Sequence, residues 1–161
     1  MAEPAIVMLR PDDSSRAASL HHAAFDSDGA WSARAIRESL SAATTLALGV
    51  EMEARLAGLL IIQRIPPEAE ILTVCVHPDM QRRGLAQQLL DHALTLLGPY
   101  GVDRLLLDVA ADNAAAISFY EANGFTRDGV RRDYYTRAGG KAVDAVLMSR
   151  SLAGQTDKSE A

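Results

Sequence analysis

The sequence predicts an α/β fold in which strands and helices alternate along most of the chain. The chain has 161 residues, a length typical of one domain. Hydrophobic residues make up 48% of it, as in ordinary globular proteins. Short apolar runs are separated by segments whose apolar residues recur every three or four positions, the spacing of a helix packed by one face. We assign residues 1–152 to a single domain and expect the small, polar segment 153–161 to be a disordered tail.

The chain is predicted to begin with a strand and a helix. Residues 5–9 are apolar and are followed by Arg10 and Pro11, which end the strand. The polar residues 12–14 favour a helix start, and the helix is expected to run to Ala24.

A second helix and a hairpin are predicted next. Ser32 is a suitable cap for a helix in which Ile36 and Leu40 recur four apart and so share one face. Residues 44–50 and 56–65 are apolar segments on either side of a short polar stretch, a pattern typical of an antiparallel hairpin.

The middle of the chain is predicted to hold two strands around a long helix. Residues 70–76 favour a strand. Apolar residues at helical spacing begin after Arg83 and stop at Gly98 and Pro99, which end the helix. Residues 102–109 form the next apolar strand.

The last third is predicted to be a helix followed by two strands. Asp112 and Asn113 favour a helix start, and Gly124 after Asn123 favours a left-handed helix end. The final expected strands are residues 125–135 and 143–148.

Composition excludes several classes of protein. Sixteen Lys and Arg against 21 Asp and Glu give a net charge of −5, whereas nucleic-acid-binding domains are usually basic. The longest apolar stretch, residues 56–62, is interrupted by Gly58 and is far shorter than the ~18 residues that indicate a membrane span. We therefore expect neither nucleic acid nor a membrane as a partner. We expect the protein to be a monomer or a weak dimer.

The cysteine and histidine residues indicate neither a disulfide nor a metal site. The single Cys75 excludes an intramolecular disulfide, and the N-terminus shows no secretory signal, so a cytoplasmic location is expected. Cys75 lies mid-strand, where a buried, inert thiol is the favoured interpretation over a nucleophile. The histidines have no Cys or His partners at metal-site spacing, so no metal is predicted.

The stretch QRRGLA at residues 81–86 follows a strand and opens a helix. The first N–H groups of a helix lack intrahelical partners, and the helix dipole favours an anion there. Gly84 allows close approach of a ligand, and Arg82 and Arg83 add positive charge. Neither the P-loop nor the three-glycine dinucleotide pattern is present. The alternative is a plain helix start with two solvated arginines.

At this stretch the sequence resembles the GNAT acyltransferase superfamily, whose acetyl-CoA loop has the pattern Gln/Arg-x-x-Gly-x-Gly/Ala. Later motifs follow in the family's order and are similar to the RimI type, the ribosomal-protein-alanine N-acetyltransferases. They are DVAADNAAA at 108–116, FYEANGF at 119–125, RRDYY at 131–135 and DA at 144–145.

The resemblance covers about residues 7–148 and implies a GNAT fold. That fold has a mixed, mostly antiparallel sheet of about seven strands, splayed in the middle and flanked by about four helices. Acetyl-CoA would enter between strands 70–76 and 105–109 as the cosubstrate, and no metal is implied. The residues that would hold it are Val74, Cys75 and Val76 on the pantetheine arm, Arg82, Arg83, Gly84, Leu85, Ala86 and Gln87 on the pyrophosphate, and Asn113 on the cofactor arm.

The resemblance also assigns a proton donor. The tyrosine of the Tyr-x-x-x-Gly-Phe stretch is Tyr120, which would protonate the departing CoA thiolate. A thiolate with a pKa near ~8.5 takes a proton from a hydroxyl near ~10 only when the two are held close together. Without the surrounding motif, Tyr120 would be a core aromatic residue on a helix face.

Two carboxylates, Asp108 and Glu70, are alternative candidates for the general base. RimI-type enzymes carry glutamate where this chain has Asp108, and arginine where it has Ala110. Asp108 is one methylene shorter and would act through a water. Glu70 occupies the position that supplies the base in histone-type GNAT enzymes. The alternatives are a strand-end cap or ion-pair partner for Asp108 and a solvated strand-start charge for Glu70.

The implied acceptor is the N-terminal alanine of a small-subunit ribosomal protein. An α-amine has a pKa of ~7.7–8.0 against ~10.4 for lysine, so it is far easier to deprotonate at neutral pH. Tyr134 and Tyr135 would form one wall of the acceptor groove and Trp31 the other, although core packing is an equal possibility for Trp31. The rival functions are a GNAT enzyme for another amine and a non-catalytic acyl-CoA-binding module.

Overall fold

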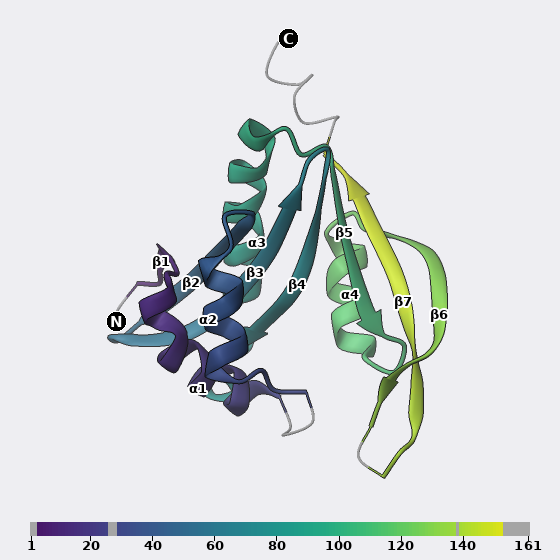
Figure 1. The fold of residues 1–161 in the computed structure, drawn as a ribbon, viewed down its shortest axis with the longest axis horizontal. Coiled ribbons are helices and arrows are strands. Elements are labelled where there is room, and N and C mark those ends of the chain that lie inside the picture. The colour runs from purple at the N-terminus through teal and green to yellow at the C-terminus, as the bar shows by residue number, and fades with distance from the viewer. Residues whose placement is uncertain (1–2, 26–28, 138, 153–161) are drawn as a thin grey trace.

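The structure, a computed structural model, describes residues 3–25, 29–137 and 139–152. The predicted tail, residues 153–161, lies outside the described residues. Within these ranges the chain forms one seven-stranded sheet and four α-helices (Figure 1). The strands are β1 (Ala5–Met8), β2 (Thr45–Met52), β3 (Arg55–Ile65), β4 (Glu68–Val76), β5 (Arg104–Ala110), β6 (Thr126–Thr136) and β7 (Ala142–Ser151). The helices are α1 (Ser14–Ala24), α2 (Ala33–Ser41), α3 (Leu85–Leu97) and α4 (Ala114–Ala122).

The sheet is mixed and mostly antiparallel, as predicted. Its strand order is β1-β2-β3-β4-β5-β7-β6, and β4 and β5 are its parallel neighbours. Their pairing ends where Ile71 meets Leu107, although β4 continues to Val76 and β5 to Ala110. The two strands meet at one end and separate toward their C-terminal ends (Figure 1). The sheet is therefore splayed at its centre, which confirms the predicted fold class.

A β-bulge precedes the separation. On β3 the neighbours Ile61 and Ile62 pair with Thr73 and Ile71 of β4, so Leu72 is an extra residue on β4. A bulge bends the strand that carries it and increases its local twist. The bend lies directly after the last β4–β5 pair, so it helps to turn the remainder of β4 away from β5.

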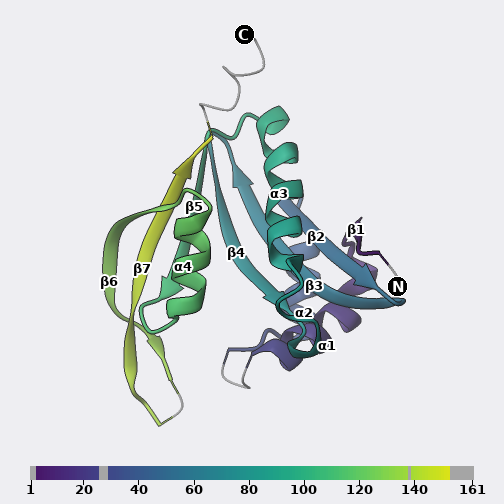
Figure 2. The same cartoon turned by 180° about the vertical axis from the view of Figure 1, so that it is seen from behind.

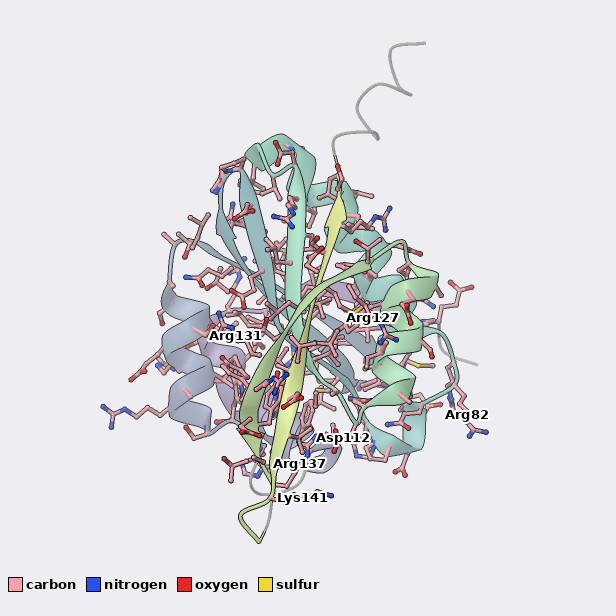
Figure 3. The ribbon with its side chains drawn as sticks, turned by 90° about the vertical axis from the view of Figure 1, so that its right-hand side faces the viewer. Arg82, Asp112, Arg127, Arg131, Arg137 and Lys141 are labelled. Atoms are coloured by element: carbon pink, nitrogen blue, oxygen red, sulfur yellow. The ribbon has the colours of Figure 1, made fainter. Side chains whose placement is uncertain are left out.

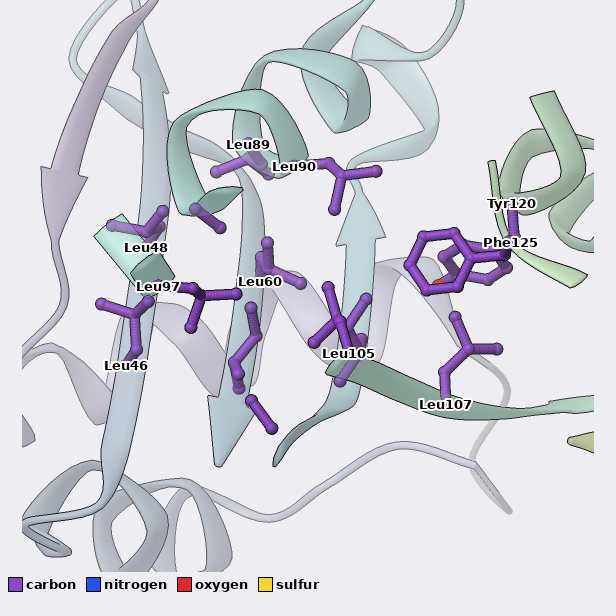
Figure 4. Packing of buried hydrophobic residues seen from close by; sticks show 14 of the residues in the cluster. Leu46, Leu48, Leu60, Leu89, Leu90, Leu97, Leu105, Leu107, Tyr120 and Phe125 are labelled. Atoms are coloured by element: carbon purple, nitrogen blue, oxygen red, sulfur yellow. The ribbon is translucent and has the colours of Figure 1, made fainter. Parts of the chain in front are cut away.

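Helices cover both faces of the sheet. Helices α1 and α2 lie on one face, and α3 and α4 lie on the other, as the two opposite views show (Figures 1 and 2). Alternate residues of β3 belong to the hydrophobic cores on the two faces of the sheet, because successive strand side chains point to opposite faces. Leu59 and Ile61 join the core beneath α1 and α2, whereas Leu60 and Ile62 join the core beneath α3. Figure 4 shows Tyr120 and Phe125 beside the leucines of the second core.

The predicted caps of α2 and α4 are present, whereas Asp13 precedes α1 without a side-chain cap hydrogen bond to it. The Ser32 hydroxyl accepts a hydrogen bond from the Ala35 N–H at 3.1 Å, and the Asn113 side chain accepts one from the Ala116 N–H at 3.1 Å. Gly124 has a φ of +86°, which confirms the left-handed end of α4.

The observed boundaries differ from the predicted ones where pairing decides them. Strand β4 starts at Glu68, two residues early, because Glu68 and Ala69 pair with both β3 and β5. Strand β7 continues to Ser151 because its end pairs with Arg104. Composition alone does not reveal such partners. Within the described ranges, no helix has the length and apolar character needed to cross a membrane.

Candidate active site

Three hollows surround the separation of β4 and β5. The first, here called the loop cavity, lies near the start of α3 and measures about 370 Å³. The second, the central cavity, lies between the separated strands and measures about 330 Å³. The third, the sheet-face groove, measures about 640 Å³ and is lined by the end of β3 and by β4, β5, β6 and β7. Tyr120 lines both the loop and the central cavity, and Asp108 lines both the central cavity and the groove.

The loop before α3 presents unpaired backbone donors to the loop cavity. Gly84 caps the helix with a left-handed φ of +75°, and the N–H of Gln88 donates to its carbonyl at 3.1 Å as the first bond of the helix. The three N–H groups before it, at residues 85–87, therefore lack intrahelical partners. Arg82 also has a positive φ of +65°, and Figure 3 shows its side chain extending away from the sheet. This arrangement suits an anion.

The residues expected at the pyrophosphate occupy different positions. Arg82, Leu85 and Ala86 line the loop cavity, whereas Arg83 and Gly84 are absent from its lining. The Gln87 side chain instead donates to Asn123 at 2.6 Å and also to Asp91, which ties α3 to the end of α4. Gln87 is also absent from the lining of the loop cavity.

Residues 74–76 form the free edge of β4. They lie beyond the last β4–β5 pair and have β3 as a partner on the other side. A strand edge of this kind has backbone groups available for an extended, amide-containing ligand. The Val76 carbonyl also accepts a hydrogen bond from the Gln81 side chain at 3.4 Å.

Cys75 has a buried thiol. It belongs to the core beneath α1 and α2, and burial raises the pKa of the thiol to about 12. Since the thiolate is the nucleophilic form, this cysteine is poorly suited to accept an acyl group.

Tyr120 has the character of a buried acid. Its ring packs edge-on against Phe119 and Phe125, with both ring centroids at 5.4 Å. Burial and, to a lesser degree, Tyr135 raise the pKa of the Tyr120 hydroxyl to about 12. Within the described part of the chain, no hydrogen bond occupies that hydroxyl. It stays protonated at neutral pH and is available to a ligand in either cavity.

The two candidate bases lie on adjacent strands. Glu70 pairs with Leu106 of β5, which places Asp108 two residues further along the same sheet face. Burial and the negative charge of Asp108 raise the pKa of Glu70, while Arg131 acts in the opposite direction. The structure separates the two by access: Asp108 reaches the central cavity with Tyr120, whereas Glu70 lines only the sheet-face groove.

The three aromatic residues expected at the acceptor are split between hollows. Trp31 and Tyr135 line the central cavity, together with Asn113. Tyr134 lines the sheet-face groove, with the Arg131 guanidinium 5.1 Å from its ring centroid. The two tyrosine rings nevertheless contact each other edge-on, with centroids 5.1 Å apart, where the register of β6 against β7 shifts.

Sequence reasoning missed Arg137 as a lining residue of the central cavity. Arg137 lies just after β6 and holds the Asp112 carboxylate by two hydrogen bonds, of 2.6 and 3.4 Å (Figure 3). The interaction with Arg137 lowers the pKa of Asp112. The alternating charges of this segment give no signal in the sequence for a bond across 25 residues.

Two further residues were missed, His21 and Thr73, which line the central cavity and hydrogen-bond to each other. The burial of His21 could have been predicted, because it follows Ala17 by four residues and so shares the buried face of α1.

The described residues contain no group of three or more His, Cys, Asp or Glu side chains able to hold a metal ion.

Comparison with known proteins identifies the family. The model of the acetyltransferase (GNAT) family matches residues 11–125. The ribosomal protein bS18-alanine N-acetyltransferase of Salmonella typhimurium is 42% identical over 65% of this chain and 70% of its own length. The Escherichia coli protein of the same name is 41% identical over 59% of this chain and 64% of its own length. The N-alpha-acetyltransferase RimI of Mycobacterium tuberculosis is 34% identical over 86% of each chain.

Solved structures agree. The ribosomal-protein-S18-alanine N-acetyltransferase from E. coli superposes with a TM-score of 0.86 and 31% identity, over 93% of this chain and 94% of that one. The protein yncA of S. typhimurium, solved with its cofactor acetyl-CoA, shares the fold with a TM-score of 0.77 and 20% identity, over 92% and 94% of the two chains. The chain therefore belongs to the GNAT family of acetyltransferases and, within it, to the RimI type.

Proposed function

We propose that this protein transfers the acetyl group of acetyl-CoA directly to the N-terminal α-amine of a protein, and that the acceptor is the N-terminal alanine of a small-subunit ribosomal protein. The observation that carries the proposal is the shared lining of the central cavity by Tyr120 and Asp108, where β4 and β5 separate. The names of the RimI-type relatives support the choice of acceptor.

The residues around the separation fit acetyl-CoA. The unpaired N–H groups at the start of α3, with Arg82 beside them, suit a pyrophosphate. The free edge of β4 at residues 74–76 suits the amides of a pantetheine arm. Tyr120 lines the same cavity as both, so a thioester held along this path would reach its hydroxyl. Acetyl-CoA supplies the acetyl group as that thioester.

Acid and base act on opposite sides of the transfer. Asp108, directly or through a water, takes a proton from the acceptor ammonium, and the freed nitrogen lone pair forms a bond to the thioester carbonyl carbon. The carbon–sulfur bond breaks, and the Tyr120 hydroxyl gives its proton to the departing sulfur. The nitrogen loses its second proton as the amide forms, and a proton taken up through solvent restores the Tyr120 hydroxyl. Its raised pKa holds the proton until a thiolate is formed beside it.

Asp108 fits the base better than Glu70. Both lie on the same sheet face, but only Asp108 also lines the cavity that contains Tyr120. The short aspartate is adequate because an α-amine is neutral in roughly a tenth of molecules at pH 7, whereas a lysine side chain is neutral in about one in 2,500.

A peptide panel tests the acceptor. The chain would be assayed with acetyl-CoA and peptides of one sequence that begin with alanine, carrying either a free or a blocked N-terminus. The free peptide should gain one acetyl group at its N-terminus by mass spectrometry, and the blocked peptide should gain none. Turnover confined to small amines would contradict a protein acceptor. Acetyl-CoA binding without CoA release for any amine would point to a non-catalytic module.

A further inference from the structure

His21 lies among aromatic residues beside the central cavity. Its side chain is 1% exposed, the lowest value among the buried polar residues of the described chain. Its ring centroid lies 4.4 Å from that of Phe25 and 5.5 Å from that of Trp31. Burial of a polar ring is costly unless its nitrogen atoms have hydrogen-bond partners.

Both nitrogens of His21 are partnered, and the partners define the tautomer. The backbone N–H of Trp31 donates to Nδ1 at 3.0 Å. Since a backbone N–H only donates, Nδ1 must carry the lone pair, and the proton of the neutral ring is on Nε2. Nε2 lies 2.9 Å from Oγ1 of Thr73 and therefore donates to it.

The ring thus links three elements at the site. It belongs to α1, its Nε2 reaches β4 next to the bulge, and its Nδ1 holds the backbone of Trp31. Trp31 lines the central cavity together with Tyr135 and Asp108. The hydrogen bond from Trp31 to Nδ1 therefore connects a wall of the cavity to the splayed part of the sheet.

We propose that His21 is a positioning residue for the acceptor, because its Nδ1 fixes the Trp31 backbone and so places the Trp31 ring as a wall of the acceptor site. This inference rests on the proposed function, in which the acceptor N-terminus enters the central cavity. Burial and the neighbouring His22 lower the pKa of His21 to about 4, which keeps Nδ1 unprotonated at neutral pH.

A matched pair of variants tests this role. In His21→Asn the amide oxygen can take the place of Nδ1 and accept from Trp31, whereas in His21→Gln the longer amide takes the place of Nε2 and reaches Thr73. Both variants remove the ring and its contacts with Phe25 and Trp31, so a merely structural role would affect them alike.

Two readouts separate binding of the acceptor from binding of the cofactor. In His21→Gln we expect KM for the acceptor peptide to rise about two- to tenfold, the effect of one lost hydrogen bond, with KM for acetyl-CoA unchanged within about twofold. In His21→Asn we expect both KM values to stay within about twofold of wild type. Equal rises of acceptor KM in both variants would contradict the proposal.

Trp31 provides an independent readout because it is the only tryptophan in the sequence. Acrylamide should quench its fluorescence more strongly in His21→Gln than in His21→Asn or the wild type. Equal quenching in the two variants would overturn the positioning role. If no peptide is acetylated even by the wild type, the proposed function fails, while this comparison still decides the role of His21.

A measurement on the wild type covers the case in which a variant does not fold. The Trp31 amide hydrogen should be protected from exchange with solvent, and the His21 ring should show the ¹⁵N chemical shifts of the Nε2–H tautomer. Free exchange at Trp31 or a protonated Nδ1 would contradict the proposal.

Discussion

The positions of Asp108 and Glu70 decide which of them is the better candidate for the base. Both face the same side of the sheet, and the charge of Asp108 contributes to the raised pKa of Glu70. Access separates the two, because Asp108 alone of the pair lines the central cavity.

We expect Asp108→Asn to lower kcat by about 10²–10⁴, the range for loss of a general base. Glu70→Gln is the matched control, because it also replaces one carboxylate on the same sheet face with an amide, and it should lower kcat by less than about tenfold. The check is steady-state kinetics of both variants with one acceptor peptide. A large loss of kcat in Glu70→Gln alone would transfer the role of base to Glu70.

Individual residues differed in how far their positions could be predicted. Tyr120 carries a motif, so its place near the cofactor loop was expected, and the structure puts it in both cavities. His21 and Arg137 carry none, since a hydrogen bond across 52 residues, as from His21 to Thr73, leaves no trace in a single sequence. Tyr134 and Tyr135 were expected together, and their rings do contact each other, although the two residues line different hollows.

At the scale of elements, the start of α3 combines an unusual backbone with a chemical task. Gly84 has a φ of +75°, and a Cβ built there would meet no atom within 4 Å. Glycine is therefore favoured at this position by the left-handed backbone conformation, and not by a lack of room for a side chain. Left-handed backbone at a residue with a side chain costs roughly 1–2 kcal/mol, and relief of that strain would move the N–H groups that follow.

We expect Gly84→Ala to lower the free energy of unfolding by roughly 1 kcal/mol and to raise KM for acetyl-CoA several-fold. Gly98→Ala is the control: it also has open space around it, but its φ of −53° is helical, so the change should be neutral or slightly stabilising. Denaturant unfolding and steady-state kinetics give both quantities. If the two variants behave alike, the left-handed conformation has no functional role.

The elements were largely predictable and their arrangement was not. Helical spacing and capping residues predicted all four helices, and apolar runs predicted all seven strands, with ends that shift by a few residues. The splay came from resemblance to a family, because the bulge at Leu72 and the end of β4–β5 pairing depend on long-range partners. Local sequence specifies propensity, whereas register depends on which strands meet.

For the whole molecule, net charge and local charge lead to different expectations. The chain has a net charge of −5, which disfavours binding of extended anionic partners such as nucleic acid. A pyrophosphate needs only local donors, and these lie at the start of α3 on one side of the splayed sheet. The carboxylates lie on the opposite sheet face, in the groove and the central cavity. The splay connects these two environments, with Tyr120 lining the hollows near both.

The proposed mechanism depends on Tyr120 as the acid that protonates the CoA thiolate. The most direct measurement compares kcat and the acetyl-CoA dissociation constant in Tyr120→Phe with those of the wild type. We predict a fall in kcat of about 10²–10⁴ with acetyl-CoA binding unchanged. The control Tyr100→Phe removes the hydroxyl of an exposed tyrosine whose ring stacks on Arg64, and it should keep full activity. Wild-type turnover in a folded Tyr120→Phe protein would contradict the mechanism.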